Sequence, residues 1–477
     1  MVSTSNGLSA LVSLISDATK VIEAEYQRDP HGIPSLEDLG PHPFDTAVYS
    51  TAMRNAIQVL EGACAQLCAT VGRPSHTMLN KAMGFYEPAC LHVVLTFKIP
   101  DILQTKPSGM HVSDLAKASG VEQGKLCRIL RLLASKHCFR EVSRDVFANN
   151  RLSLQIVSTE PFYNLALDYV GDNYKWTSEL AETLGDPNWG HSSAPHHSSF
   201  NKYTKYPRSF FQYLEGDTPS GREYAGRLNL AMIGWGVATE SGAVVKDFPW
   251  YELPSGASVC DVGGGVGTVS MKLAKAYPHL KFKLQDTPQC IEKAQNDIWP
   301  SLYPEAVLQK RIEFKAMDFL VESPIRGCHI YYLKHVIHDW PDEACIKILT
   351  GIRNSMALHS RVLIQEYILQ PACEVESDQT SSHPSAPRPL LPNYGAGRIR
   401  QYNIDLDMMT SLNSQERTLE DFIRLGKLAG LRFVKLWTVG EMGVVELSIE
   451  KSGPQSSELG DPPNTSSGCN IHLRCNL

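Results

Sequence analysis

Apolar runs and amphipathic helical patterns alternate from residue 257 onward, and this alternation constrains the fold more than any other feature of the chain. The runs ASVCDV, KFKLQD, RIEFKAMD, CHIYYLKHV and RVLIQEYIL have the length and composition of buried strands, and helical patterns such as TVSMKLAKAY lie between them. Such alternation predicts an α/β fold with a doubly wound parallel sheet and crossover helices. The last two runs, FVKLWTV and VVELSIE, follow each other closely, so we expect them to pair antiparallel.

The chain of 477 residues is long enough to add further domains to this sheet. We expect, in order, a helical N-terminal segment (1–75), a winged-helix-like module (76–155), a helical, aromatic-rich connector (156–235), the sheet domain (236–450) and a disordered tail (451–477). Within the sheet domain, the proline- and serine-rich stretch 371–397 is predicted to be a surface insertion. Some aromatic residues of the connector are expected to line an apolar pocket.

The predicted winged-helix module has two helical patterns that flank a turn at Gly120, followed by a hairpin pattern at FREV and VFAN. Such modules read DNA in many proteins, and Lys125, Arg128 and Arg131 decorate the second helix of this one. The same helix is also very apolar, and the net charge of -6 gives no general electrostatic reason to bind nucleic acid. A packing or dimerisation role is therefore favoured.

Cysteine and histidine usage bears on the compartment and on metal binding. The twelve cysteines are scattered, mostly inside apolar segments, which favours reduced thiols in a cytoplasmic protein. No apolar stretch is long enough to span a membrane, and the N-terminus lacks the features of a signal peptide. Cys64 and Cys68 share a helix face, and His191, His196 and His197 share a loop, but neither group has partners at the spacing of a metal site. We therefore expect no metal.

The glycine-rich turn in VCDVGGGVGTVSMKLA joins a strand to a helix and indicates a ligand site. Gly263, Gly264 and Gly265 have no Cβ, so a ligand can approach their backbone, and the start of the helix favours an anionic group. Asp286 and Asp318 end the next two strands, where carboxylates can bind ribose hydroxyls or an adenine. The alternative is that both acids cap the turns that follow them. We favour a nucleoside ligand, because an acid ends two successive strands beside the same turn.

His338 stands where the buried run HIYYLKHVI stops, and ligands bind at the carboxyl ends of parallel strands in sheets of this kind. An imidazole there is suited to take a proton from a substrate hydroxyl. Glu366 lies within the next apolar run, and Glu416 precedes the helical pattern RTLEDF. Two carboxylates can hold an imidazole in one tautomer and stabilise its protonated form. The alternatives are a core histidine, a buried ion-pair partner and a charge in the first turn of a helix.

Six short motifs occur in a fixed order: DVGGGVG, LQDTPQCI, AMDFL, LKHVIHDWPDE, VLIQEYIL and NSQERTLEDF. Together they resemble the cation-independent, S-adenosylmethionine-dependent O-methyltransferases of the plant caffeate and flavonoid type. They are most similar to the fungal branch that acts on polyketides and other aromatic natural products. The resemblance covers roughly residues 80–450. It implies a Rossmann-like class I methyltransferase sheet, preceded by a winged-helix dimerisation domain, and a homodimer.

The resemblance also implies roles for individual residues. Besides the glycine turn, the positions that lie around the cofactor S-adenosylmethionine in this family match Asp286, Asp318, Phe319 and Lys334. The general base and the two carboxylates that orient it match His338, Glu366 and Glu416. The positions that border the substrate match Asp339, Met408 and Met409.

The predicted activity is therefore methylation of a hydroxyl on an aromatic or polyketide-like small molecule of secondary metabolism. A close alternative keeps the fold and cofactor but methylates nitrogen or catalyses another reaction. A winged-helix regulator that binds the cofactor without turnover is an alternative of a different class. A nicotinamide dehydrogenase is disfavoured, because Thr268 replaces the third glycine of the dinucleotide fingerprint. The chain departs from the family in the long segment between Glu366 and Glu416 and in Tyr367, which replaces a small residue.

Overall fold

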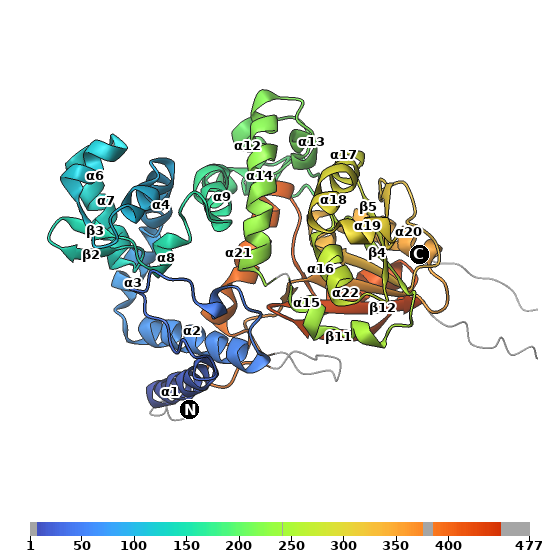
Figure 1. The fold of residues 1–477 in the computed structure, drawn as a ribbon, viewed down its shortest axis with the longest axis horizontal. Coiled ribbons are helices and arrows are strands. Elements are labelled where there is room, and N and C mark those ends of the chain that lie inside the picture. Colours follow the sequence, from blue (N-terminus) through green and yellow to red (C-terminus); the bar gives the residue numbers. More distant parts are fainter. Residues whose placement is uncertain (1–6, 241, 375–384, 450–477) are drawn as a thin grey trace, which may run out of the picture.

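The computed structural model describes residues 7–240, 242–374 and 385–449. Elements from the first third of the chain form a helical lobe, and elements from the second half form a sheet domain (Figure 1). Helices α14 (Pro219–Ala238) and α21 (Ile399–Leu412) lie between the two in this view. The tail that we predicted to be disordered, 451–477, lies outside the described residues. Among the helices of the described residues, none is both long and apolar enough to cross a membrane.

The main sheet has seven strands in the order β11-β12-β8-β7-β4-β5-β6. The strands in chain order are β4 (Ser258–Val262), β5 (Lys281–Asp286), β6 (Ile312–Ala316), β7 (Ile330–Lys334), β8 (Arg361–Glu366), β11 (Leu431–Val439) and β12 (Met442–Ile449). Neighbours are parallel except at β12, which is antiparallel to both β8 and β11. This topology confirms the predicted doubly wound sheet with an antiparallel last strand. The chain order reverses between β4 and β7, and ligands of such folds bind at the carboxyl ends of the strands at that point.

Alternate residues of β7 pack on opposite faces of the sheet. Tyr331 and Leu333 belong to one core cluster, and Ile330 and Tyr332 belong to the other. The first cluster includes residues of α20 (Asp342–Ser355) and α22 (Leu419–Leu428), and the second includes residues of α15 (Ala243–Asp247), α16 (Thr268–Ala276), α17 (Pro288–Lys293) and α18 (Trp299–Leu302). Both faces are therefore covered, as a parallel sheet requires, and the open end of β7 is left for function.

The winged-helix prediction is also confirmed. Helices α6 (Val112–Ser119) and α7 (Gln123–Ser135) flank Gly120, which ends α6 in a left-handed conformation. Strands β1 (Met110–His111), β3 (Val146–Ala148) and β2 (Arg140–Ser143) form an antiparallel sheet in that order. Arg131, one of the basic residues of α7, forms ion pairs with Glu141 at 2.6 Å and Asp145 at 2.8 Å. The charge of Arg131, one of the three basic residues that suggested DNA binding, is therefore neutralised within the module.

The second half of the predicted surface insertion is partly packed and not wholly exposed. Helices α1 (Gly7–Tyr26) and α2 (Thr51–Val71) share a core with the segment 385–398, in which Leu390 and Tyr394 are buried. The Gln66 side-chain amide donates a hydrogen bond of 2.8 Å to the Pro389 carbonyl. This half of the predicted surface insertion is therefore partly buried, because apolar side chains from the start of the chain cover some of its residues. Residues 375–384 of the insertion lie outside the described residues.

The connector contains short helices around an aromatic core. They are α9 (Phe162–Leu167), a π-helix (Asp168–Asn173), α10 (Tyr174–Thr177), α11 (Leu180–Leu184), α12 (Ser199–Thr204) and α13 (Phe210–Leu214), followed by α14. Trp176, Phe200 and Tyr224 belong to this core. The loop with the three histidines His191, His196 and His197 is tied to the end of α21. Asn413 Nδ2 donates to the Ser192 and Ala194 carbonyls, at 2.8 and 2.9 Å.

The remaining helices of the N-terminal lobe lie on either side of the winged-helix motif. They are α3 (Pro74–Ala82), α4 (Tyr86–Thr96), α5 (Ile99–Gln104) and α8 (Arg151–Leu154). Helices α4 and α5 contribute Val94, Leu95 and Ile99 to the same buried cluster as α7. The lobe therefore has a core of its own, apart from the two cores of the sheet.

Candidate active site

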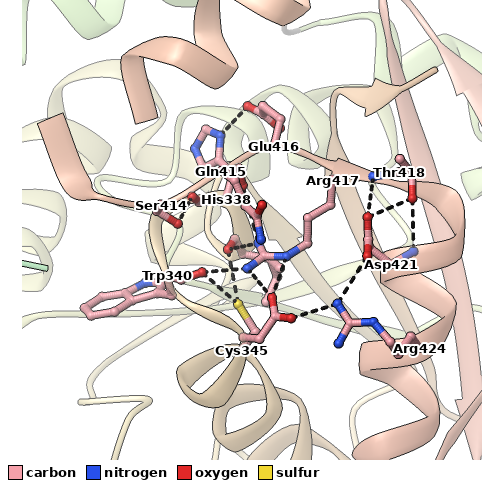
Figure 2. Close-up of polar contacts among 12 residues, drawn as sticks. His338, Trp340, Cys345, Ser414, Gln415, Glu416, Arg417, Thr418, Asp421 and Arg424 are labelled. Atoms are coloured by element: carbon pink, nitrogen blue, oxygen red, sulfur yellow. Dashed lines mark hydrogen bonds and ion pairs between the residues drawn. The ribbon is translucent and has the colours of Figure 1, made fainter. Parts of the chain in front are cut away.

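His338 and Glu416 form a buried pair just beyond the carboxyl end of β7. His338 lies in a short 3-10 turn (Ile337–Asp339), and its Nδ1 donates a hydrogen bond of 2.6 Å to Glu416 Oε1 (Figure 2). Only 6% of His338 and 3% of Glu416 are exposed. A carboxylate on Nδ1 fixes the tautomer and leaves Nε2 as the second nitrogen, which is the arrangement that a general base needs. The predicted contact between these two residues is therefore present.

Two short strands bring Glu416 to this position. β9 (Ile368–Leu369) pairs in parallel with β10 (Arg417–Thr418), so Arg417 stands opposite Ile368. The Glu416 backbone N–H donates to Asp405 Oδ1 at 2.9 Å, which ties it to α21. The ladder thus places a residue distant in sequence directly over the end of β7.

Glu366 forms its hydrogen bonds with the backbone of the turn, and it acts on the His338 imidazole only through its charge, which helps to raise the imidazole pKa. Its Oε1 accepts hydrogen bonds from the backbone N–H groups of Val336, Ile337 and His338, at 3.1, 2.6 and 3.2 Å. The physical reason is that β7 ends at Lys334, so the next N–H groups have no strand partner and need another acceptor. Burial raises the pKa of the Glu366 carboxyl to about 7, although His338 opposes this shift.

Arg417 holds the carbonyl side of the same turn, and we had not predicted this role. Its guanidinium donates to the Ile337 and Trp340 carbonyls, at 2.8 Å each, and to Asp342 Oδ1 (Figure 2). The residue is only 1% exposed. The signal in the sequence was its place beside Glu416, in a segment whose next residues start an apolar helix. Glu366 and Arg417 together fix the turn from its N–H side and its carbonyl side.

The charges around His338 make it an unusually strong base. Burial alone would lower the pKa of its imidazole, but the carboxylates of Glu416 and Asp339 outweigh burial and raise the pKa to about 10. Asp339 Oδ1 lies 3.3 Å from His338 Nε2. Burial raises the pKa of Asp339 to about 6, against the opposing charge of His338. The predicted substrate residue Asp339 is thus in place beside the nitrogen that Glu416 does not occupy.

His335 is a second histidine at this site, half-buried with both ring nitrogens enclosed, and our sequence reasoning overlooked it. Its ring stacks on that of His338, with centroids 4.9 Å apart and an angle of 26° between the planes. Its backbone is left-handed, with φ of 53°. Within the described part of the chain, neither ring nitrogen has a hydrogen-bond partner. Burial and the Lys334 charge lower its pKa well below 6.5.

The glycine turn packs directly against the segment that carries His338. A Cβ on Gly263, whose φ is 70°, would lie 2.9 Å from Val336 Cγ2 and 3.2 Å from Phe319 Cε1. A Cβ on Gly264 would lie 2.5 Å from Asp261 Cγ, so both positions require glycine. Gly265, with φ of 58°, has no heavy atom near its Cβ direction and faces open space. The turn is therefore closely packed on one side and accessible on the other.

Asp286 and Asp318 both bond to backbone N–H groups, so the capping interpretation of each is compatible with the structure. Asp286 Oδ2 accepts from Gly265 at 2.8 Å, which ties the end of β5 to the glycine turn. Asp318 Oδ1 accepts from Leu320 at 2.9 Å, and the residue is exposed. Both acids still lie at the carboxyl edge of the sheet, where a ribose and an adenine are expected to bind.

An aromatic row extends from the predicted adenine side toward the connector. Phe319 meets Trp340 edge to face at 5.8 Å, and Trp340 stacks on Phe211 of α13 at 5.4 Å. Lys334, the other predicted cofactor residue, ends β7, and burial lowers its pKa to about 8. Trp340 lies two residues after His338, and we had not singled it out.

The two methionines predicted to border the substrate lie on α21. Met408 packs against the aromatic core of the connector and against the cluster that contains Tyr367. Met409 is half-buried. Between the connector and α21, Asp407 accepts hydrogen bonds from Asn173 at 3.1 Å and Ser411 at 3.0 Å. Contact of Met408 and Met409 with a substrate stays a prediction.

Comparison with known proteins identifies the class to which this fold and site belong. A family model for O-methyltransferase domains matches residues 235–432, and one for O-methyltransferase dimerisation domains matches residues 79–158. The chain is 41% identical over 447 residues to 3-O-methyltransferase 2 of Phanerochaete chrysosporium, covering 92% of this chain and 97% of that protein. It is 33% identical over 455 residues to O-methyltransferase gedA of Aspergillus terreus, covering 89% and 92%.

Solved structures agree on the fold. The mitomycin 7-O-methyltransferase MmcR superimposes with a TM-score of 0.62 at 24% identity, covering 81% of this chain and 99% of that one. OxaC in complex with S-adenosylhomocysteine and oxaline gives a TM-score of 0.65 at 20% identity, covering 92% and 100%. The protein belongs to the O-methyltransferase family with a dimerisation domain, and it is an S-adenosylmethionine-dependent O-methyltransferase.

Proposed function

We propose that this enzyme methylates a hydroxyl group of an aromatic or polyketide-like small molecule in secondary metabolism, with His338 as the general base. The buried hydrogen bond between His338 Nδ1 and Glu416 Oε1 carries the proposal. It supports a base whose second nitrogen, Nε2, takes the substrate proton. Named fungal O-methyltransferases among the relatives support methylation of an oxygen.

The pKa of His338 suits a phenolic substrate. A phenol has a pKa near 10, so proton transfer to an ordinary histidine of pKa near 6.5 is uphill by roughly 5 kcal/mol. With the His338 pKa raised to about 10, the two pKa values nearly match and most of this cost disappears. The match has a second consequence. The imidazole must be deprotonated to act as a base, so activity should rise with pH.

The residues around the glycine turn fit S-adenosylmethionine. This cofactor supplies an electrophilic methyl group on a positively charged sulfur. The open space above Gly265 admits a ligand to the backbone, and the carboxylates of Asp286 and Asp318 are acceptors for ribose hydroxyls and an adenine amine. We assign Gly263, Gly264, Phe319 and Lys334 to the same site. Glu366 and Arg417 hold the backbone of the segment that carries His338 in place beside the glycine turn.

We assign Asp339, Met408 and Met409 to the substrate site. Asp339 can hold the substrate hydroxyl beside His338 Nε2, since its carboxylate lies 3.3 Å from that nitrogen. Met408 offers an adaptable apolar wall next to the aromatic core of the connector. The connector, 156–235, thus forms one side of the proposed pocket.

A homodimer in the cytoplasm completes the proposal. The match to the dimerisation domain supports it, as do exposed apolar side chains around α3 and α4. They are Met78, Leu79, Met83, Phe85 and Tyr86, each 47–62% exposed. The ten cysteines of the described residues are all free thiols, which suits a reducing compartment. Light scattering at micromolar concentration should give twice the mass of the 52.9 kDa chain.

Methyl transfer from labelled S-adenosylmethionine to a panel of phenols tests the proposed function. We expect labelled product from the wild type and a loss of kcat/KM of about 10²- to 10⁴-fold in His338→Ala, the usual contribution of a general base. His359→Ala, an exposed histidine substitution near the start of β8, is the control and should keep full activity. Full activity in His338→Ala would remove the proposed base.

A further inference from the structure

Three side chains at the active site form a cluster that the methyl-transfer mechanism does not fully use. One ligand atom each of His335, His338 and Glu416 lie within 4.8 Å of one another. All three residues flank the carboxyl end of β7, and the two imidazole rings are stacked. Mechanism accounts for His338 and for one oxygen of Glu416. It gives no role to His335 or to the second oxygen.

The unused atoms are buried and lack hydrogen bonds. Across the described residues, both ring nitrogens of His335 and Glu416 Oε2 are buried atoms with no hydrogen-bond partner. Buried polar atoms in native proteins nearly always have a partner, so each exception needs an explanation. His335 also keeps a left-handed backbone, with φ of 53°, which costs a residue with a Cβ about 1–3 kcal/mol. The fold therefore holds the His335 ring, with its two unpaired nitrogens, against the His338 ring, and this arrangement lowers the stability of the protein.

We propose that His335, His338 and Glu416 bind a divalent ion of the zinc class, and that the bound ion blocks His338 as a base. Two imidazoles and a carboxylate are ligands that suit zinc and its first-row neighbours. Ligand atoms about 2.0–2.1 Å from a tetrahedral ion lie about 3.3 Å apart. Rotation of His335 can bring its nitrogen to that spacing from the other two ligand atoms, since its ring has no hydrogen bond within the described residues to break.

Metal binding and methyl transfer exclude each other in either mode of coordination. An ion on His338 Nε2 occupies the lone pair that accepts the substrate proton. An ion on Nδ1 instead displaces the Glu416 hydrogen bond of 2.6 Å and removes the carboxylate that orients the ring. In both cases the ion is an inhibitor of a reaction that does not require it. His335 is the ligand that raises the affinity for zinc, because a His–Glu pair without a third ligand binds zinc weakly.

Calorimetric titration of the full-length enzyme with zinc chloride tests the site without any substrate. We expect wild type to bind one ion at this site and His335→Asn to bind it at least tenfold more weakly. Asparagine is chosen because it tolerates left-handed backbone but has no imidazole. His335→Gly, which relieves the strain entirely, is a second variant in case the first does not fold. His359→Ala is the matched control, because His329 and His359 form another histidine contact, with centroids 4.5 Å apart, at the other end of β7.

Inhibition of methyl transfer gives an independent readout. The zinc concentration that halves activity should be at least tenfold higher in His335→Asn than in wild type, each measured against its own zinc-free rate. His359→Ala should behave as wild type, and a chelator should restore the activity. Equal affinity and equal inhibition in wild type and His335→Asn would overturn the proposal, since zinc would then bind elsewhere. Absence of zinc binding to wild type would overturn it as well, whatever the outcome for methyl transfer.

Discussion

Strand β7 has a pair of histidines at each end, and one member of each pair, His329 and His338, has its pKa shifted in the direction opposite to that of the other. His329 precedes the strand, contacts the exposed His359, and has its pKa lowered by burial and by that neighbour. His338 follows the strand, contacts His335, and has its pKa raised to about 10 although it is the more deeply buried of the two. The difference is the carboxylates of Glu416 and Asp339, which act on His338, whereas among the described residues no carboxylate contributes to the pKa shift of His329. Residue type alone does not make a base, and the charges that the fold brings to the ring decide its chemistry.

The largest effect in this comparison is expected from removing the acceptor that shapes the second end. Glu366→Ala leaves three buried backbone N–H groups without their acceptor, so we expect the free energy of unfolding to fall by about 2–4 kcal/mol. Denaturant unfolding followed by tryptophan fluorescence measures this loss. Glu366→Gln is the matched control, since its amide oxygen can still accept, and should cost less than about 1 kcal/mol. Equal losses in both variants would show that the charge, and not the acceptor, holds the turn.

A smaller effect, on kcat/KM and its pH dependence and not on stability, is expected from Glu416→Gln. Only the deprotonated imidazole accepts a proton, so kcat/KM of wild type should rise as pH increases toward the His338 pKa of about 10. Without the Glu416 charge the pKa falls, so the rising limb should move to lower pH. The rate at high pH should drop by about 10- to 100-fold, because a weaker base remains and its orientation is less secure.

A pH profile of kcat/KM from pH 6 to pH 10 measures this shift. Glu313→Gln is the control, since it removes an exposed acid of β6 that pairs with Lys283, and its profile should overlay that of wild type. If the rising limb of Glu416→Gln lay at the same pH as that of wild type, the pH dependence of kcat/KM would not arise from deprotonation of His338.

The smallest effect should come from the first end of β7. His329→Asn removes a ring nitrogen that accepts from the Ser258 N–H at 3.2 Å and lies 3.3 Å from the Ser258 hydroxyl, two part-buried hydrogen bonds to one residue. We expect a change of no more than about 1 kcal/mol in the free energy of unfolding and a kcat/KM within about twofold of wild type. A large loss of activity here would mean that the two ends of the strand are coupled, and the contrast drawn above would fail.

The fold was predictable because it depends on local patterns. Period-2 burial in β7 and the helical spacing of α20 and α22 are visible in one sequence, and strand–helix alternation leaves few topologies. The residues suggested Glu416 as a partner of His338, and the family resemblance assigned it that role. The physical cause of this pairing, the short ladder between β9 and β10, involves two residues on each side and has no signature in the sequence.

The features that could not be predicted concern which groups a side chain contacts. Which residues lie at the site was easier to predict. Glu366 was expected near His338 and is near it, but it binds the backbone, because the need for an acceptor arises where β7 stops. His335 looked like an ordinary strand residue, since a left-handed φ is set by the surrounding fold. The burial of Leu390 and Tyr394 depends on helices more than 300 positions earlier in the chain.

That last contact joins the beginning of the chain to the segment that leads into α21. Helices α1 and α2 lie outside the region matched by the dimerisation domain, which starts at residue 79. A chain shortened to that boundary would keep every predicted catalytic residue and yet expose the apolar side of residues 385–398, just upstream of Met408 and Glu416. Helices α1 and α2 thus brace the segment that leads into α21, and trimming them is expected to loosen this helix, to which the backbone N–H of Glu416 is hydrogen-bonded.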